Sequence, residues 1–171
     1  MPESARRHLL DRHARQVAHR VRDEATFHEA RVLMLVAAYS ADGQGIPGLP
    51  ELSRLDFLLR FPPVLDHVPT PGQVWPQPLT ADRAERQAVT MLYGIAHYGL
   101  WSDRYLRITG ALVGRHLISV PTGPEPPGFV TADAGRLAAQ RRAASPAWQR
   151  TASRAAFLHE HLAAVAEQLD D

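Results

Sequence analysis

The chain has 171 residues, and its 19 basic and 18 acidic side chains give a formal net charge of +1, so the whole protein has no strong attraction to nucleic acid or to a membrane surface. It has no cysteine, which excludes disulfides, thiolate nucleophiles and cysteine-ligated zinc. No apolar run approaches the roughly 18 residues of a membrane span, and the N-terminus lacks the apolar core of a secretory signal, so we expect a cytoplasmic protein.

The first predicted element is a basic amphipathic helix at residues 4–24, within an N-terminal segment that we place at residues 1–25. Such a helix suits phosphate or an acidic partner, and it is equally typical of a frayed terminal extension. Residues 26–40 have little polar surface and predict the first core helix. The glycines and prolines of SADGQGIPGLP end that helix.

A short helix is predicted for ELSRLDFLLRF, with apolar surface on more than one side, and Pro62 and Pro63 terminate it. A proline-rich loop follows at residues 62–80. Trp75 in this loop either pins it to the core or anchors a partner, because tryptophan is enriched at interface hot spots. The segment ADRAERQAVTMLYGIAHYGLW predicts the next helix, capped by Thr80.

The segment DRYLRITGALVGRHL predicts an amphipathic helix in which one face packs on a core and the other carries arginines. The inward residues are expected to be Tyr105, Leu106, Thr109, Leu112, Val113, His116 and Leu117, with Ile108 straying towards the outside. The outward arginines are Arg104, Arg107 and Arg115. Guanidinium groups there could meet DNA, a carboxylate of a partner protein, or only water.

A two-stranded wing is predicted next, with strands at LISV and FV separated by a turn rich in proline and glycine. The turn carries Glu125 and no arginine, unlike a wing that contacts phosphates. Thr131 is expected to cap a following helix. Helix, strand, turn, strand and helix in this order are typical of small docking modules for nucleic acids or proteins.

Residues 131–154 hold five arginines against Asp133, and three of these arginines are further candidates for contact with DNA or a partner: Arg136, Arg141 and Arg142. The last predicted helix, residues 147–169, has apolar residues spaced three and four apart: Trp148, Thr151, Ala155, Leu158, Leu162, Val165 and Leu169. This heptad seam favours self-association, a coiled-coil partner or the N-terminal helix folding back, and an ordinary helix on the body is the alternative.

These patterns predict a mainly α fold with a small β-wing, namely a winged helix-turn-helix-like domain with helical extensions at both ends. We place the domain at residues 26–143 and the heptad-like extension at residues 144–171. We expect the partner-docking residues to be Trp75, Trp148, Leu158, Leu162, Val165 and Leu169.

Signatures of catalysis are missing from the sequence. It contains no phosphate loop, dinucleotide fingerprint, serine elbow or paired-carboxylate spacing. His159 and His161 are two apart on a helix and point about 200° away from each other, so they cannot share a metal ion. We therefore predict no enzyme activity, no cofactor and no metal.

Three segments together resemble a known family: LSRLDFLLRFP, MLYGIAHYGLWSDRYLRITGALVGRHLISV and FVTADAGRLAAQ. They are similar to the middle component of bacterial three-component ABC ATPase conflict systems. The similarity is carried by Leu55 to Pro62 and by Trp101, Asp103, Arg104 and Tyr105, and it spans roughly residues 30–140. It implies a non-catalytic adaptor between an SMC-like ATPase and an effector, in defence against phage or plasmids.

Two functions remain open at this point. The first is the adaptor, whose partners would be the ATPase and effector encoded in the same operon, with double-stranded DNA as a further contact. The second is a stand-alone winged-helix transcription regulator that binds DNA and dimerises through its last helix.

Overall fold

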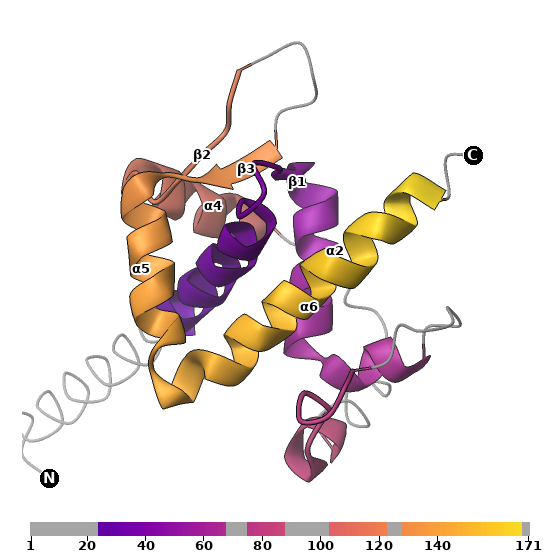
Figure 1. Cartoon of the computed structure of the whole chain (residues 1–171). Helices are drawn as coiled ribbons and strands as arrows, with labels where there is room; N and C mark the ends of the chain where they lie inside the picture. The colour runs from indigo at the N-terminus through magenta and orange to yellow at the C-terminus, as the bar shows by residue number, and fades with distance from the viewer. Residues whose placement is uncertain (1–23, 68–74, 88–102, 123–127, 169–171) are drawn as a thin grey trace, which may run out of the picture.

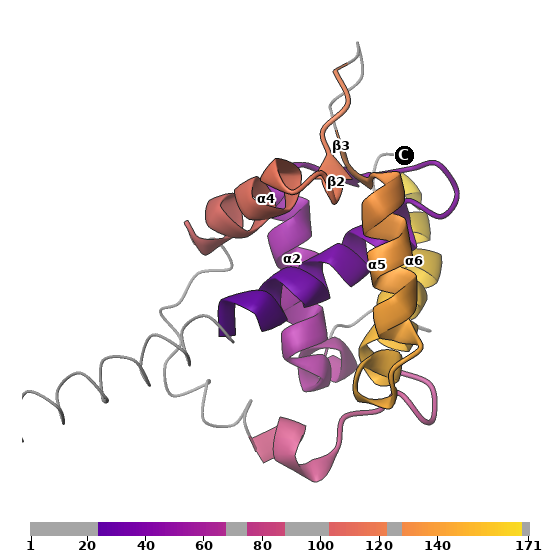
Figure 2. The same ribbon diagram turned by 90° about the vertical axis from the view of Figure 1, so that its left-hand side faces the viewer.

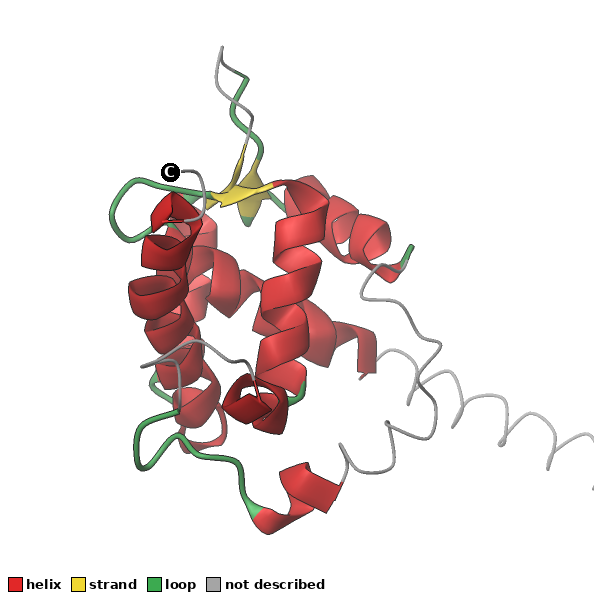
Figure 3. Cartoon of the chain, turned by 90° about the vertical axis from the view of Figure 1, so that its right-hand side faces the viewer, coloured by secondary structure: helices red, strands yellow, loops and turns green. Residues whose placement is uncertain are grey.

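The computed structural model describes residues 24–67, 75–87, 103–122 and 128–168, and the predicted N-terminal basic helix lies almost entirely outside this part of the chain. The described part is mainly helical, with a small three-stranded antiparallel sheet at one end (Figures 1 and 3). The prediction of a mainly α fold with a small β element is thereby confirmed.

The elements follow one another in chain order. The first helix covers residues 24–39 and is called helix 24–39 below. The next elements are β1 (Ile46–Pro47), α2 (Gly48–Arg60) and the 3₁₀ helix η1 (Pro62–His67). Residues 83–87 are helical. The chain continues with α4 (Arg104–Gly114), β2 (Ile118–Ser119), β3 (Gly128–Thr131), α5 (Asp133–Ala143) and α6 (Pro146–Gln168).

The sheet has the strand order β1-β3-β2, so its first strand lies beside its last. Ile46 pairs with Phe129, and Ile118 pairs with Thr131. The sequence predicted β2 and β3 but missed β1, because a two-residue strand inside a glycine- and proline-rich stretch has no periodicity to detect. Gly45 allows the close approach, since a Cβ there would lie 3.0 Å from the Phe129 carbonyl oxygen.

One continuous hydrophobic core joins helix 24–39, α2, α4 and α6. Its fully buried members include Leu35, Leu52, Leu112 and Leu158, one from each of these helices. Figure 2 shows helix 24–39 crossing α2, with α5 and α6 beside them. The core therefore extends well beyond the predicted domain boundary at residue 143, and α6 is part of the body.

The assignment of the α6 seam to an external partner was wrong for its buried members, Ala155, Leu158 and Leu162. Leu158 and Leu162 are buried in the protein's own core, and the Leu158 carbonyl accepts a hydrogen bond from the Tyr39 hydroxyl at 3.2 Å. Heptad spacing reports that one face of a helix is apolar, but it does not report which surface covers that face. The side chain of Val165 and the whole of Leu169 lie outside the described residues.

Helix α4 is rotated about its axis relative to the prediction. Its buried residues are Tyr105, Ile108, Thr109 and Leu112. Leu106 and Val113, which were predicted to face inwards, are exposed, and so is His116. Tyr105 faces inwards in both orientations, and Ile108, which was predicted to stray outwards, is the residue that is buried instead of Leu106 and Val113.

Candidate interaction surface

A buried polar triad fixes where α4 lies. Arg31 of helix 24–39 donates to both carboxylate oxygens of Asp56 in α2, with Nε–Oδ1 at 2.6 Å and Nη2–Oδ2 at 2.9 Å. The Tyr105 hydroxyl of α4 donates to the same carboxylate at 2.7 Å. Asp56 is 1% exposed, so its charge is stable in the core only because these donors surround it. The triad joins three helices at one carboxylate.

The surroundings of the Tyr105 hydroxyl raise its pKa. Burial, followed by the neighbouring Asp56 carboxylate, raises the pKa of Tyr105 well above its ordinary value of 10. The hydroxyl therefore remains a donor at any physiological pH. The sequence pattern placed Tyr105 inside the molecule but did not identify Asp56 as its buried acceptor. The signal for Asp56 was a single acidic residue within the apolar run LDFLL.

The outward face of α4 has an unusual composition. Leu106 is 54% exposed and Val113 is 40% exposed. Between them and the arginines lie Gly110 and Gly114, where an added Cβ would meet no atom within 4 Å. Arg107 is exposed on the same face, and its guanidinium has no partner among the described residues. We call these five residues the α4 outer face.

The other two α4 arginines are largely neutralised. Arg115 forms an ion pair with Glu29 at 2.5 Å, and Arg104 lies 3.7 Å from Glu24. Both acids belong to helix 24–39, and they line a shallow groove between that helix and α4 together with His28, Arg104 and Arg107. The predicted positive ridge is therefore reduced to Arg107 as its one unpaired cation within the described residues.

The three α5 arginines do not extend this ridge. Arg136 pairs with Asp133 in its own helix, and the Arg142 guanidinium lies over the Trp148 ring at 5.5 Å from its centroid. Arg141 is exposed. Figure 2 shows α4 and α5 at separate positions around the molecule. The six arginines that we predicted as one contact set thus lie on two different helices, and most of them already have intramolecular partners.

Trp75 is a core residue, as the first of its two interpretations expected, and its alternative assignment as a docking residue was wrong. It is 2% exposed, its Nε1–H donates to the Pro62 carbonyl at 2.7 Å, and its ring packs 5.2 Å from that of Phe157. Trp148 is half-buried and packs against the ring of Phe27 at 4.9 Å. Both rings are thus engaged within the molecule.

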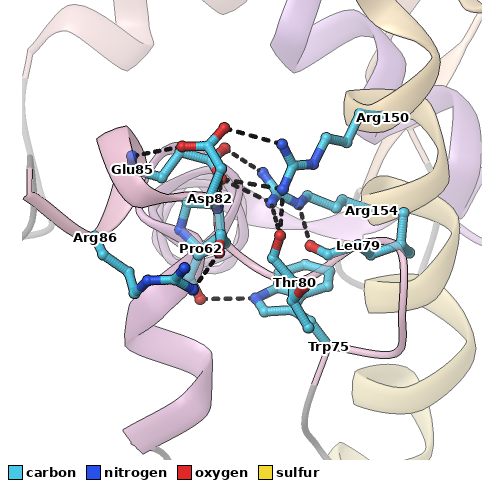
Figure 4. A network of polar contacts seen from close by, with 10 residues as sticks. Pro62, Trp75, Leu79, Thr80, Asp82, Glu85, Arg86, Arg150 and Arg154 are labelled. Atoms are coloured by element: carbon cyan, nitrogen blue, oxygen red, sulfur yellow. Dashed lines mark hydrogen bonds and ion pairs between the residues drawn. The ribbon is translucent and has the colours of Figure 1, made fainter.

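Two α6 arginines hold residues 79–85 against the body (Figure 4). Arg154 donates to the Leu79 carbonyl at 2.9 Å and to Glu85 at 2.6 Å. Arg150 donates to Asp82 at 3.1 Å and to the Thr80 carbonyl. These pairs are about 70 residues apart in sequence, so no local pattern indicated them. Arg150 and Arg154 are two of the five arginines in the basic segment 131–154.

The short helix at residues 83–87 begins with a capping box. The Asp82 carboxylate accepts from the Glu85 backbone N–H at 2.9 Å, and the Glu85 carboxylate accepts from the Asp82 N–H at 2.9 Å. The predicted cap, Thr80, instead offers its carbonyl to the α6 arginines. The second predicted cap, Thr131, ends β3, and Ala132 takes the N-cap position of α5.

The environment of His28 in this groove predicts that folding stability depends on pH. Burial, followed by the neighbouring Arg31 guanidinium, lowers the pKa of His28 below its ordinary 6.5, although Glu24 acts in the opposite direction. The unfolded chain therefore takes up the His28 proton at higher pH than the folded protein does, and folding stability should fall as the pH falls below 6.5. We expect His28→Gln to flatten this fall in urea denaturation between pH 7.5 and 5.5. Parallel curves for the two proteins would contradict the assignment.

Comparison with protein-family models, curated proteins and solved structures gave no match for this chain. Within the described ranges, no helix is long and apolar enough to cross a membrane.

Proposed function

We propose that this chain is a non-catalytic adaptor with a winged-helix fold, which links an SMC-like ABC ATPase to an effector protein. The order of elements supports the winged-helix assignment. Helix 24–39, β1, α2, α4, β2 and β3 follow one another as in that fold, and the sheet order β1-β3-β2 places the wing strands beside β1. Residues 61–103 are then an insertion between the second helix and the helix that precedes the wing.

The observation that carries the proposal is the α4 outer face. In a DNA-reading winged helix, the helix before the wing presents side-chain donors and acceptors to base edges. Here the corresponding face presents two glycines, Leu106 and Val113, and only Arg107 carries donors. An apolar face with one cation and open space above its glycines suits a protein surface better than the major groove.

The resemblance to the middle components agrees with this fold in one physical respect. Asp56 lies in the Leu-Asp-Phe-Leu-Leu-Arg-Phe-Pro segment, and Tyr105 lies in the Asp-Arg-Tyr segment. These two residues meet at the buried carboxylate that sets the position of α4. The segments that carry the resemblance therefore build the scaffold of the proposed interface.

The proposal is tested by co-expression with the proteins encoded beside this gene. We expect the tagged chain to co-elute in size-exclusion chromatography with a neighbouring ATPase that has a long coiled-coil insertion, or with the effector. Binding to neither protein at micromolar concentration would contradict the adaptor function.

A stand-alone DNA-binding regulator is the second candidate, because Arg107 lies exposed on the helix before the wing. It requires tight, sequence-selective duplex binding that weakens steeply with salt. The triple variant Arg104→Glu, Arg107→Glu and Arg115→Glu should then abolish that binding in fluorescence anisotropy. For the adaptor we expect no sequence-selective binding by the wild-type protein at 150 mM salt, and a selective nanomolar complex would favour the regulator.

A further inference from the structure

We propose that the α4 outer face binds an α-helix of the partner protein, with the partner backbone seated on Gly110 and Gly114 and a partner carboxylate paired with Arg107. This inference rests on the proposed adaptor function and specifies the chemistry of its contact.

Among the residues that the structure describes, nothing accounts for the two glycines. Both lie within α4 or at its last residue, where glycine is the least favourable ordinary residue for a helix. Neither position is crowded, since a Cβ at each would meet nothing within 4 Å, and neither has a positive φ. They are four residues apart and therefore lie on the same face of the helix. A pair of glycines in this arrangement lets a second helix approach closely, backbone against backbone.

The edge of this face is apolar. Leu106 and Val113 are seven residues apart, so they lie one above the other along the helix beside the glycines. Both remain exposed, at 54% and 40%, although nearby Ile108 and Leu112 are buried. A partner helix that rests on the glycines would cover these two side chains. The result is an apolar contact along about two turns of α4.

The charge of Arg107 indicates the chemistry of the partner helix. Glu24 and Glu29 line the same groove as Arg107 but pair with Arg104 and Arg115, whereas the exposed Arg107 guanidinium has no carboxylate partner within the described residues. A second copy that docks through the same face would bring two Arg107 side chains onto one contact, and the described acids beside that face, Glu24 and Glu29, are already paired. Charge complementarity therefore favours a different protein, whose helix carries aspartate or glutamate beside small and apolar residues.

The test uses the full-length chain with the ATPase and the effector encoded beside its gene as probes. We expect Gly110→Leu and Gly114→Leu to weaken binding to one of these proteins at least tenfold, because the added side chains hold the helices apart. Arg107→Glu should weaken the same complex at least tenfold. The matched control Gln140→Leu, which places leucine on the exposed face of α5, should bind like the wild type.

Folding and binding are separable in this test. Both leucine variants should melt at the same or higher temperature than the wild type, since leucine is the better helix former, so lost binding would not reflect lost structure. Hydrogen exchange should show protection of one partner helix, and replacing its acidic residue with lysine should restore binding to Arg107→Glu. Wild-type affinity of both leucine variants would overturn this inference and leave the adaptor function intact, whereas a wild-type chain that binds neither protein would overturn both.

Discussion

Asp56→Ala should lower the free energy of unfolding by about 3–5 kcal/mol, the range that is typical when one partner of a buried ion pair is removed. The Arg31 side chain, which is 6% exposed, would keep its charge in the core without an acceptor, and the Tyr105 hydroxyl would lose its acceptor as well. Urea denaturation followed by far-ultraviolet circular dichroism measures the loss. A change below about 1 kcal/mol would contradict the role of the triad.

Two matched variants separate the charge from the contacts. Asp133→Ala removes a carboxylate that also pairs with an arginine, but at the surface, and should change stability by less than about 1 kcal/mol. Tyr105→Phe removes only one hydrogen bond to Asp56 and should cost about 1–3 kcal/mol. The order Asp56→Ala, Tyr105→Phe, Asp133→Ala is therefore the expected ranking of destabilisation.

Sequence periodicity predicted an element well where a single repeat extends over the whole of that element. The α6 helix was predicted at residues 147–169 and is observed at Pro146–Gln168, because a long amphipathic repeat that starts at a proline defines one continuous helix. The wing strands were also predicted, because prolines and glycines separate two short β-prone runs. The strand β1 was missed because two residues carry no repeat.

The interaction surface was less predictable, because it depends on which groups meet in space. The sequence placed Arg104, Arg107 and Arg115 outside but could not show that Glu24 and Glu29 neutralise two of them from another helix. An apolar seam has the same sequence pattern whether a partner or the protein itself covers it. The rotation of α4 exposes Leu106 and Val113 and buries Ile108 in a core built by several helices, and periodicity does not report which face that core covers.

Gly135→Ala should destabilise the protein by about 3 kcal/mol, near the upper end of the usual cost of overpacking. A Cβ at Gly135 would overlap the carbonyl oxygen of Leu117 and lie 2.7 Å from its carbonyl carbon. These are backbone atoms, and the same carbonyl accepts a hydrogen bond from the Ala132 N–H at 3.1 Å, just before α5 begins. The Leu117 N–H in turn donates to the Leu112 carbonyl at 2.9 Å. Relief of the clash would therefore pull α5 away from the end of α4.

The same substitution at Gly110 is the control with the opposite expected sign. Gly110 also lies inside a helix, but the space above it is open, so Gly110→Ala should raise stability by about 1 kcal/mol through helix propensity alone. Urea denaturation of both variants in one buffer makes the comparison direct. If Gly135→Ala were as stable as the wild type, the close contact between α5 and Leu117 would be wrong. If Gly110→Ala were destabilised, the glycine would have a structural role inside this chain, and a partner helix would no longer be needed to explain it.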